Sequence, residues 1–235
     1  MERVVLRDGL LAAVNRVVDI TKTKTSLPAV TSSVLVTLTG PLCKVAATDF
    51  EISAVAESHV SHEGGDATIK QRGDDVPVSF LVNGPLLASV LAGYPQALLT
   101  LDVPAADGAE SPPPVVVRRA PGDGVCNVTV SLPQFSLDSY PVMNDSLLPQ
   151  DHETIFNVPT DKLLLAFDKV AYAASRNDDR YELQGVMLRL IAGDLITAAT
   201  DGYRMATCTV TVDESGQSTP VVVVPSRTVR LIQGA

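Results

Sequence analysis

The chain has no tryptophan, and all aromatic residues together make up only 4% of its 235 residues. It has three cysteines, scattered along the chain and never spaced as C-x-x-C. An odd number of dispersed thiols implies neither a disulfide framework nor a zinc site. We therefore expect Cys43, Cys126 and Cys208 to be reduced and buried, in a core built mainly from valine, leucine and alanine.

Long apolar runs are also missing. No run approaches the ~18 residues that a membrane-spanning helix needs, and residues 1–8 carry charges where a signal peptide has its apolar core. The sequence therefore predicts a cytoplasmic protein. The phosphate-binding patterns G-x-x-x-x-G-K-[ST] and G-x-G-x-x-G are absent, as is the hydrolase pattern G-x-S-x-G, so no cofactor and no catalytic residue is expected.

Basic residues are outnumbered by acidic ones, 18 to 27, and the formal net charge is -9. This balance argues against a wholly basic nucleic-acid binder but leaves room for a local basic face. The only metal-like cluster is His59, His62 and Glu63. It lies in a polar, glycine-rich stretch without a further ligand, which favours a solvated loop over a metal site.

One stretch of sequence occurs twice. Ala-Ala-Thr-Asp appears at residues 46–49 and again at 198–201, and the flanking patterns also agree, with Asp8-Gly-Leu-Leu before the first copy and Asp161-Lys-Leu-Leu before the second. The repeat is far too long for a solenoid unit. It indicates a whole domain used twice, which we place at residues 1–150 and 151–235.

Hydrophobic periodicity predicts similar elements in each copy. In the first, Asp8 is the expected N-cap of a helix, and Asn83 opens a second one. Strands are expected at 4–6, 34–38, 42–48, 52–60, 76–82, 98–103, 115–118 and 127–130.

In the second copy, Thr160 is the expected N-cap of a helix whose apolar stripe includes Phe167 and Val170. A hairpin at 186–190 and 195–199 turns at Gly193, and a last helix covers 227–233. The second copy therefore stops inside its second helix, which predicts an incomplete domain with an exposed sheet edge and apolar surface.

Lys162, Lys169 and Arg176 are each seven residues apart. A helix continuing through all three would place them along one face, away from its apolar stripe. By spacing alone, an ordinary solvated face is the better explanation of these cations.

Three stretches resemble the bacterial sliding clamp, the beta subunit of DNA polymerase III. They are residues 24–28 leading to 47–52, residues 173–175 leading through Arg180 and Tyr181 to 183–186, and residues 199–205. The resemblance implies an α+β fold of DNA-clamp (processivity-fold) domains, each with two helices packed on a curved antiparallel sheet. It also implies one complete copy, one incomplete copy and an absent third domain.

The resemblance further implies site residues. Those expected to touch DNA are Lys24, Arg176, Asn177, Arg180 and Tyr181.

A hydrophobic peptide pocket for client proteins is implied at Thr200, Gly202, Arg204 and Met205. Glycine lets a ligand backbone approach closely, and methionine supplies an adaptable apolar wall. The alternative is a tight turn with Asp201 capping its own backbone.

By the same resemblance, the chain would be a non-catalytic processivity factor or its N-terminal fragment. The expected partners are duplex DNA held without sequence preference, the DNA polymerase III catalytic subunit, the clamp loader and other clamp-motif proteins, with a homodimeric ring in the full-length family. A second hypothesis is a clamp-like interaction protein that does not encircle DNA. A third is an enzyme using Asp49, Glu51 and Asp201, although no sequence feature brings these carboxylates together.

Overall fold

The computed structural model describes residues 1–21, 29–60, 76–94, 98–105, 112–119, 128–141, 157–176, 180–212 and 218–234. The chain divides into two compact units, Met1–Met143 and Asn144–Ala235. The domain boundary predicted at residue 150 lies outside the described residues. Each unit is described by itself.

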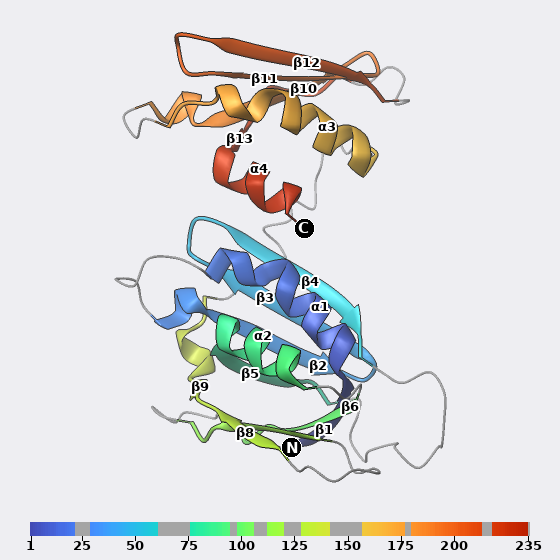
Figure 1. The fold of residues 1–235 in the computed structure, drawn as a ribbon, viewed down its shortest axis with the longest axis vertical. Helices are drawn as coiled ribbons and strands as arrows, with labels where there is room; N and C mark the ends of the chain where they lie inside the picture. The colour runs from blue at the N-terminus through green and yellow to red at the C-terminus, as the bar shows by residue number, and fades with distance from the viewer. Residues whose placement is uncertain are drawn as a thin grey trace. The chain divides into compact units, whose positions relative to one another are not determined.

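The described residues of unit 1 form two antiparallel sheets and two α-helices (Figure 1). One sheet has the order β4-β3-β2-β5-β9, and the other has the order β1-β6-β7-β8. The elements are β1 (Glu2–Leu6), α1 (Arg7–Val17), η1 (Val18–Thr21), η2 (Ala29–Ser32), β2 (Ser33–Thr39), β3 (Leu42–Thr48), β4 (Ser53–His59), β5 (Val78–Asn83), α2 (Gly84–Gly93), β6 (Leu98–Asp102), β7 (Val115–Arg119), β8 (Thr129–Leu132), β9 (Gln134–Phe135) and η4 (Leu137–Ser139).

The core of unit 1 forms where its helices cover the first sheet. Helix α1 packs on β3 and β4, and α2 packs on α1, β2 and β5. Leu10, Val14 and Val17 lie on the buried side of α1, at the helical spacing that the sequence shows. Phe80 on β5 is fully buried. As expected, no large aromatic cluster is needed, because β-branched and leucine side chains fill the interior.

Unit 2 has one antiparallel sheet, in the order β12-β11-β10-β13, and two α-helices. Its elements are α3 (Thr160–Val170), η6 (Ala171–Ala173), η7 (Tyr181–Leu183), β10 (Gly185–Ile191), β11 (Asp194–Thr200), β12 (Met205–Thr211), β13 (Val222–Pro225) and α4 (Ser226–Gln233). Phe167 and Val170 of α3 pack with Val186, Ala199 and Val229 in its main core cluster.

The two units repeat the same arrangement of elements. The order β4-β3-β2-β5 in unit 1 matches β12-β11-β10-β13 in unit 2. Helix α3 packs on β11 and β12 as α1 packs on β3 and β4, and α4 packs on β10 and β13 as α2 packs on β2 and β5. The duplication predicted from Ala-Ala-Thr-Asp is therefore confirmed as a repeat of sheet order and helix placement, and the α+β fold with it.

Two predicted helix caps are wrong. Helix α1 begins one residue before Asp8, at Arg7, and neither α1 nor α3 has a side-chain cap hydrogen bond. Thr160 is itself the first residue of α3. Both helices follow directly on a strand or a proline, and packing of their apolar faces sets where they start. The predicted capping residue of α2 is confirmed, since Asn83 Oδ1 accepts a hydrogen bond from Leu86 N at 2.9 Å.

The Asn83 cap gives a first testable prediction. Asn83→Ala should lower the free energy of unfolding by about 1 kcal/mol, because a backbone N–H of α2 loses its acceptor. Chemical denaturation measures the change. Leu86→Ala is the matched control: it keeps the cap and removes a side chain that is 43% exposed, so its effect should be smaller. Equal losses in both variants would mean that the cap contributes nothing.

The thiols are partly as expected. Cys43 is fully buried, and burial raises its pKa to about 12, so it stays a protonated, unreactive thiol. Cys208 is only half-buried, which corrects the prediction for that residue. Cys126 lies outside the described residues.

The edge strand β13 exposes apolar side chains. Val222 and Val223 of β13, and Val221 just before it, are each about half exposed, and within the described residues β13 pairs on one side only, with β10. Its counterpart β5 lies between β2 and β9. The exposed apolar edge expected in the second copy is therefore found at β13. In the described part of the chain, no helix has the length and apolar character to cross a membrane.

Candidate functional site

The four residues 201–204 join β11 to β12 in a tight, hydrogen-bonded turn. Asp201 Oδ1 accepts from the backbone N–H groups of Tyr203 and Arg204, each at 3.0 Å. Thr200 Oγ1 donates to the Arg204 carbonyl at 2.7 Å and accepts from Gly202 N at 3.0 Å. Hydrogen bonds from the backbone of Tyr203, then of Arg204, hold the pKa of Asp201 below its usual value. The turn is therefore ordered by its own side chains.

Arg204 connects this turn to the end of helix α3. Its Nε donates to Asp201 Oδ2 at 3.0 Å, and its Nη2 donates to the Tyr172 carbonyl at 3.1 Å. Its guanidinium also lies over the Tyr172 ring, 5.7 Å from the ring centre, a cation–π geometry. The same side chain thus fixes both the turn and the residue just after α3.

Gly202 has a backbone conformation that disfavours a side chain, and the end of a neighbouring arginine lies against it. Its φ is +90°, in the left-handed region. A Cβ at this position would lie 2.7 Å from Nη1 of Arg180. The structure therefore brings Arg180, which the resemblance implies as a DNA contact, directly against the glycine of the turn implied as the peptide site.

Exposed aromatic and apolar side chains surround the turn. Tyr203 is 95% exposed and Met205 is 67% exposed. Tyr172 and Tyr181 are also exposed, whereas Tyr94 and Tyr140 in unit 1 are buried. Sequence reasoning did not assign Tyr172 or Tyr203 to the site. Tyr203 could have been assigned to the site from its place inside the repeated stretch. No local sequence pattern could have linked Tyr172 to Arg204.

Unit 1 builds the same turn with different side chains. Asp49 Oδ1 accepts from the backbone N–H groups of Glu51 and Ile52, as Asp201 does in unit 2. Phe50 occupies the Gly202 position with a φ of 73°, and Ile52 occupies the Arg204 position. The capped turn predicted as the alternative is therefore present in both copies. Only the second copy adds the glycine and the arginine.

The residues implied as DNA contacts are only partly described. Lys24 and Asn177 lie outside the described residues. Arg180 and Tyr181 are exposed at the start of η7. The helix does not continue to Arg176, because α3 ends at Val170 and Ala174 is already extended. Lys162 and Lys169 both lie in α3, but Arg176 does not share a helical face with them.

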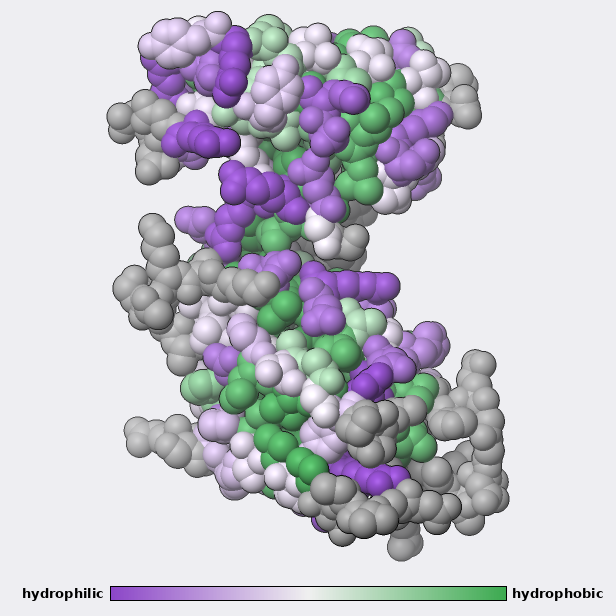
Figure 2. All heavy atoms as spheres, in the orientation of Figure 1, coloured by the Kyte–Doolittle hydropathy of each residue, from purple (hydrophilic) through white to green (hydrophobic). Residues whose placement is uncertain are grey.

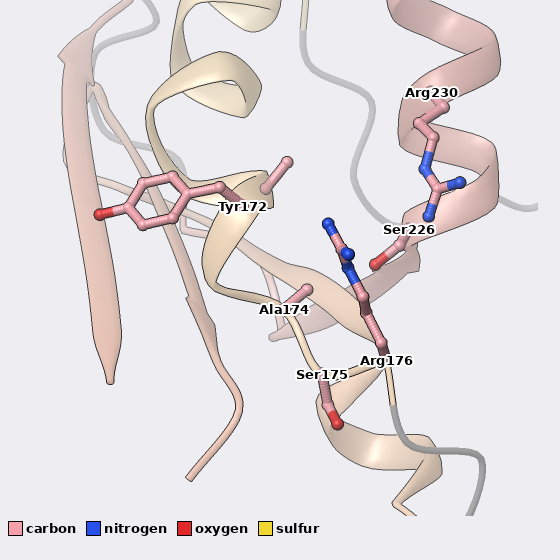
Figure 3. A pocket seen from close by; sticks show the side chains of 7 residues that line it. Tyr172, Ala174, Ser175, Arg176, Ser226 and Arg230 are labelled. Carbon is pink, nitrogen blue, oxygen red and sulfur yellow. The ribbon is translucent and has the colours of Figure 1, made fainter. Parts of the chain in front are cut away.

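Arg176 instead contributes to a hollow of about 520 Å³ between η6 and α4 (Figure 3). Residues lining it include Tyr172, Ser175 and Arg176 on one side and Ser226 and Arg230 on the other. Figure 2 shows hydrophilic side chains gathered over the visible face of α4. The hollow adjoins the turn through Tyr172, which contacts Arg204.

The carboxylates of the enzyme hypothesis are divided between the two units. Asp49 and Asp201 lie in different units, and each is engaged by the backbone of its own turn. Within the described residues, no group of three or more potential metal ligands is present. His62 and Glu63, from the metal-like cluster, lie outside those residues.

Comparison with known proteins gives consistent results. Residues 157–234 match the family model of the DNA polymerase III beta subunit, central domain. The beta sliding clamp of Caulobacter vibrioides is 26% identical over 243 residues, covering 100% of this chain and 58% of the relative. That of Streptomyces coelicolor is 33% identical over 160 residues, covering 67% of this chain and 34% of the relative.

Solved structures share the fold. A sliding clamp of Pseudomonas aeruginosa superimposes with a TM-score of 0.78 at 20% identity, covering 99% of this chain and 56% of that chain. A sliding clamp of Bacillus subtilis superimposes with a TM-score of 0.76 at 22% identity, covering 99% of this chain and 56% of that chain. The chain spans little more than half the length of these relatives. By the family match, the whole-chain relatives and the shared fold, the chain belongs to the DNA polymerase III beta subunit family, whose members it matches over part of their length.

Proposed function

We propose that the chain is the part of a DNA sliding clamp that docks client proteins and contributes to holding duplex DNA. The observation that carries the proposal is the exposed turn at Thr200–Met205, in a domain that matches the central domain of the DNA polymerase III beta subunit. The function is non-catalytic: the clamp keeps a polymerase on DNA by topology, and its clients bind through a short hydrophobic peptide.

The peptide site would consist of Thr200, Gly202, Arg204 and Met205. Gly202 adds no side chain of its own to the turn, although Arg180 lies against it. Exposed Met205 offers a flexible apolar surface. Tyr172 and Tyr203 add amphipathic rings of the kind enriched at binding hot spots. Because Arg204 and Asp201 already order the turn, little entropy would be lost when a peptide binds.

DNA would be held by weak, sequence-independent attraction to its phosphates. Lys24, Arg176, Asn177, Arg180 and Tyr181 are the proposed contacts. Arg180 and Tyr181 are exposed, as such a role requires. A clamp must slide, so these contacts should be few and salt-sensitive rather than base-specific.

Two measurements test the proposal. Retention on circular DNA that is lost when the DNA is cut would support encirclement in a ring. Binding of a fluorescent hydrophobic clamp-motif peptide, followed by anisotropy, would support the client site. A chain that shows neither retention nor peptide binding would overturn the proposed function.

Charge reversal tests the DNA contacts. Lys24→Glu combined with Arg180→Glu should weaken duplex binding and reduce its salt-dependence slope by roughly one to two, since each lost phosphate contact removes about one released counterion. Filter binding at several salt concentrations measures the slope. Arg180→Glu alone is compared with Arg189→Glu, the same reversal at an exposed residue of β10. If both single variants weaken binding equally, only net charge matters and the specific contacts are refuted.

A second candidate is a clamp-like interaction protein that binds clients or clamp subunits without encircling DNA. The exposed valines of β13 favour it, because within the described residues this strand pairs on one side only, and an apolar edge strand can accept another polypeptide. Peptide binding without retention on circular DNA would select this candidate.

A further inference from the structure

Two arginines from different elements converge on one hollow in unit 2. Arg176 follows η6, and Arg230 lies in the middle of α4. Both line the same cavity of about 520 Å³. Figure 3 shows both guanidinium groups projecting into the space between η6 and α4, with Ser226 beside them.

Neither arginine is engaged by the part of the protein that the structure describes. No hydrogen bond or ion pair among the described residues involves either guanidinium, and no carboxylate among them lines the hollow. Arg7 pairs with Asp8, Arg118 with Glu2 and Arg204 with Asp201. Arg189 also has no ion pair among the described residues, so the feature that sets Arg176 and Arg230 apart is that both line one hollow.

Arg176 and Arg230 are both exposed, so solvent screens the repulsion between their charges. An oxyanion placed between two guanidinium groups reverses the sign of the interaction and can receive a fork of N–H donors from each. The geometry therefore suits a ligand carrying negative charge.

The residue beside the two arginines, Ser226, holds the start of α4 in place and does not supply a further hydrogen-bond donor to a ligand. Ser226 N and Ser226 Oγ both donate to the Gln184 carbonyl, at 2.9 and 2.6 Å. The hydroxyl proton is thus committed, and these bonds fix the start of α4 beside η7. The positive end of the α4 dipole lies at the same edge of the hollow, which favours an anion by a modest amount.

We propose that Arg176 and Arg230 form a binding site for a dianionic phosphate group, that is, a terminal phosphate rather than a phosphodiester. Two guanidinium charges match the two charges of a phosphomonoester near neutral pH, whereas a backbone phosphodiester or a carboxylate neutralises only one. A volume of about 520 Å³ exceeds what one phosphate fills, so the group would enter attached to a larger molecule or as a polyphosphate. The site shares Arg176 with the proposed duplex contacts, but it does not depend on encirclement of DNA or on the peptide turn.

Its ligand could come from two sources with the same chemistry, a free polyphosphate or the 5′ end of a nucleic-acid strand. The first measurement is binding of inorganic pyrophosphate to the whole chain, by ³¹P NMR or calorimetry. The second compares a short single-stranded oligonucleotide carrying a 5′-phosphate with the same oligonucleotide carrying a 5′-hydroxyl. We expect saturable pyrophosphate binding, and at least about fivefold tighter binding of the phosphorylated strand.

Substitutions locate the site. Arg176→Gln and Arg230→Gln should each weaken pyrophosphate binding by about tenfold, while Arg189→Gln, which removes the same charge from an exposed residue of β10, should leave it unchanged. Circular dichroism confirms that each variant is folded.

The outcomes separate the possibilities. Pyrophosphate binding with equal affinity for the two oligonucleotides supports the site with a free polyphosphate as ligand. Tighter binding of the phosphorylated strand, lost in Arg230→Gln, supports a strand end. Absence of pyrophosphate binding together with equal oligonucleotide affinities overturns the proposal, as does an equal loss in Arg189→Gln. Peptide binding at Thr200–Met205 is measured separately, so failure here leaves the proposed function standing.

Discussion

Gly9→Ala is expected to destabilise unit 1 by about 3 kcal/mol, toward the upper end of what overpacking a closely packed site costs. A Cβ on Gly9 would lie 2.1 Å from the backbone carbonyl oxygen of His59. This contact cannot be relieved by a side-chain rotation, because the atom it meets is backbone. The chain nearby is also tied down, since Leu6 N donates to the Val60 carbonyl at 2.8 Å. Either α1 or the end of β4 must move.

The measurement follows from the distribution of tyrosines. The chain has no tryptophan, and the two buried tyrosines, Tyr94 and Tyr140, both lie in unit 1. Near-ultraviolet circular dichroism in increasing urea should therefore report mainly on unit 1. Gly93→Ala is the matched control, because a Cβ there meets nothing within 4 Å. It should be neutral or stabilising by up to about 1 kcal/mol. A Gly9→Ala midpoint equal to that of Gly93→Ala would refute the close approach.

The duplication could be predicted from sequence because its signal is local. Thr48 with Asp49, and Thr200 with Asp201, each close their own turn through hydrogen bonds that span only a few residues. The same residue types in the same order therefore specify the same turn twice. Each turn lies between two strands of a hairpin. The positions of these strands could be predicted from the repeated stretch and from the alternation of apolar and polar residues.

Other features depended on contacts that sequence spacing does not encode. The seven-residue interval from Lys169 to Arg176 would mark one face only if the helix continued, and α3 ends at Val170. Where a helix ends is decided by packing of its last turn. Likewise, Arg230 shares a hollow with Arg176, and Tyr172 is bound by Arg204, across sequence separations that no periodicity spans.

Replacing Arg204 with alanine is expected to weaken client-peptide binding by about 30-fold or more, the range of an arginine hot spot of about 2 kcal/mol. The substitution removes the ion pair with Asp201, the hydrogen bond to the Tyr172 carbonyl and the cation–π contact with the Tyr172 ring. Tyr172 and the turn then lose their only described side-chain connection. Because Asp201 Oδ1 still accepts from two backbone N–H groups, the turn itself should remain folded.

Two control variants make this result interpretable. Arg189→Ala removes an exposed arginine from β10 and should leave peptide affinity unchanged. Arg204→Lys keeps the charge but lacks the planar fork that reaches Asp201 and Tyr172 together, so its affinity should fall between those of the wild type and Arg204→Ala. Fluorescence anisotropy with one labelled peptide compares all four proteins. A folded Arg204→Ala variant that binds the peptide as tightly as the wild type would exclude this turn as the docking site, because no part of the proposed pocket could then depend on the side chain that holds it together.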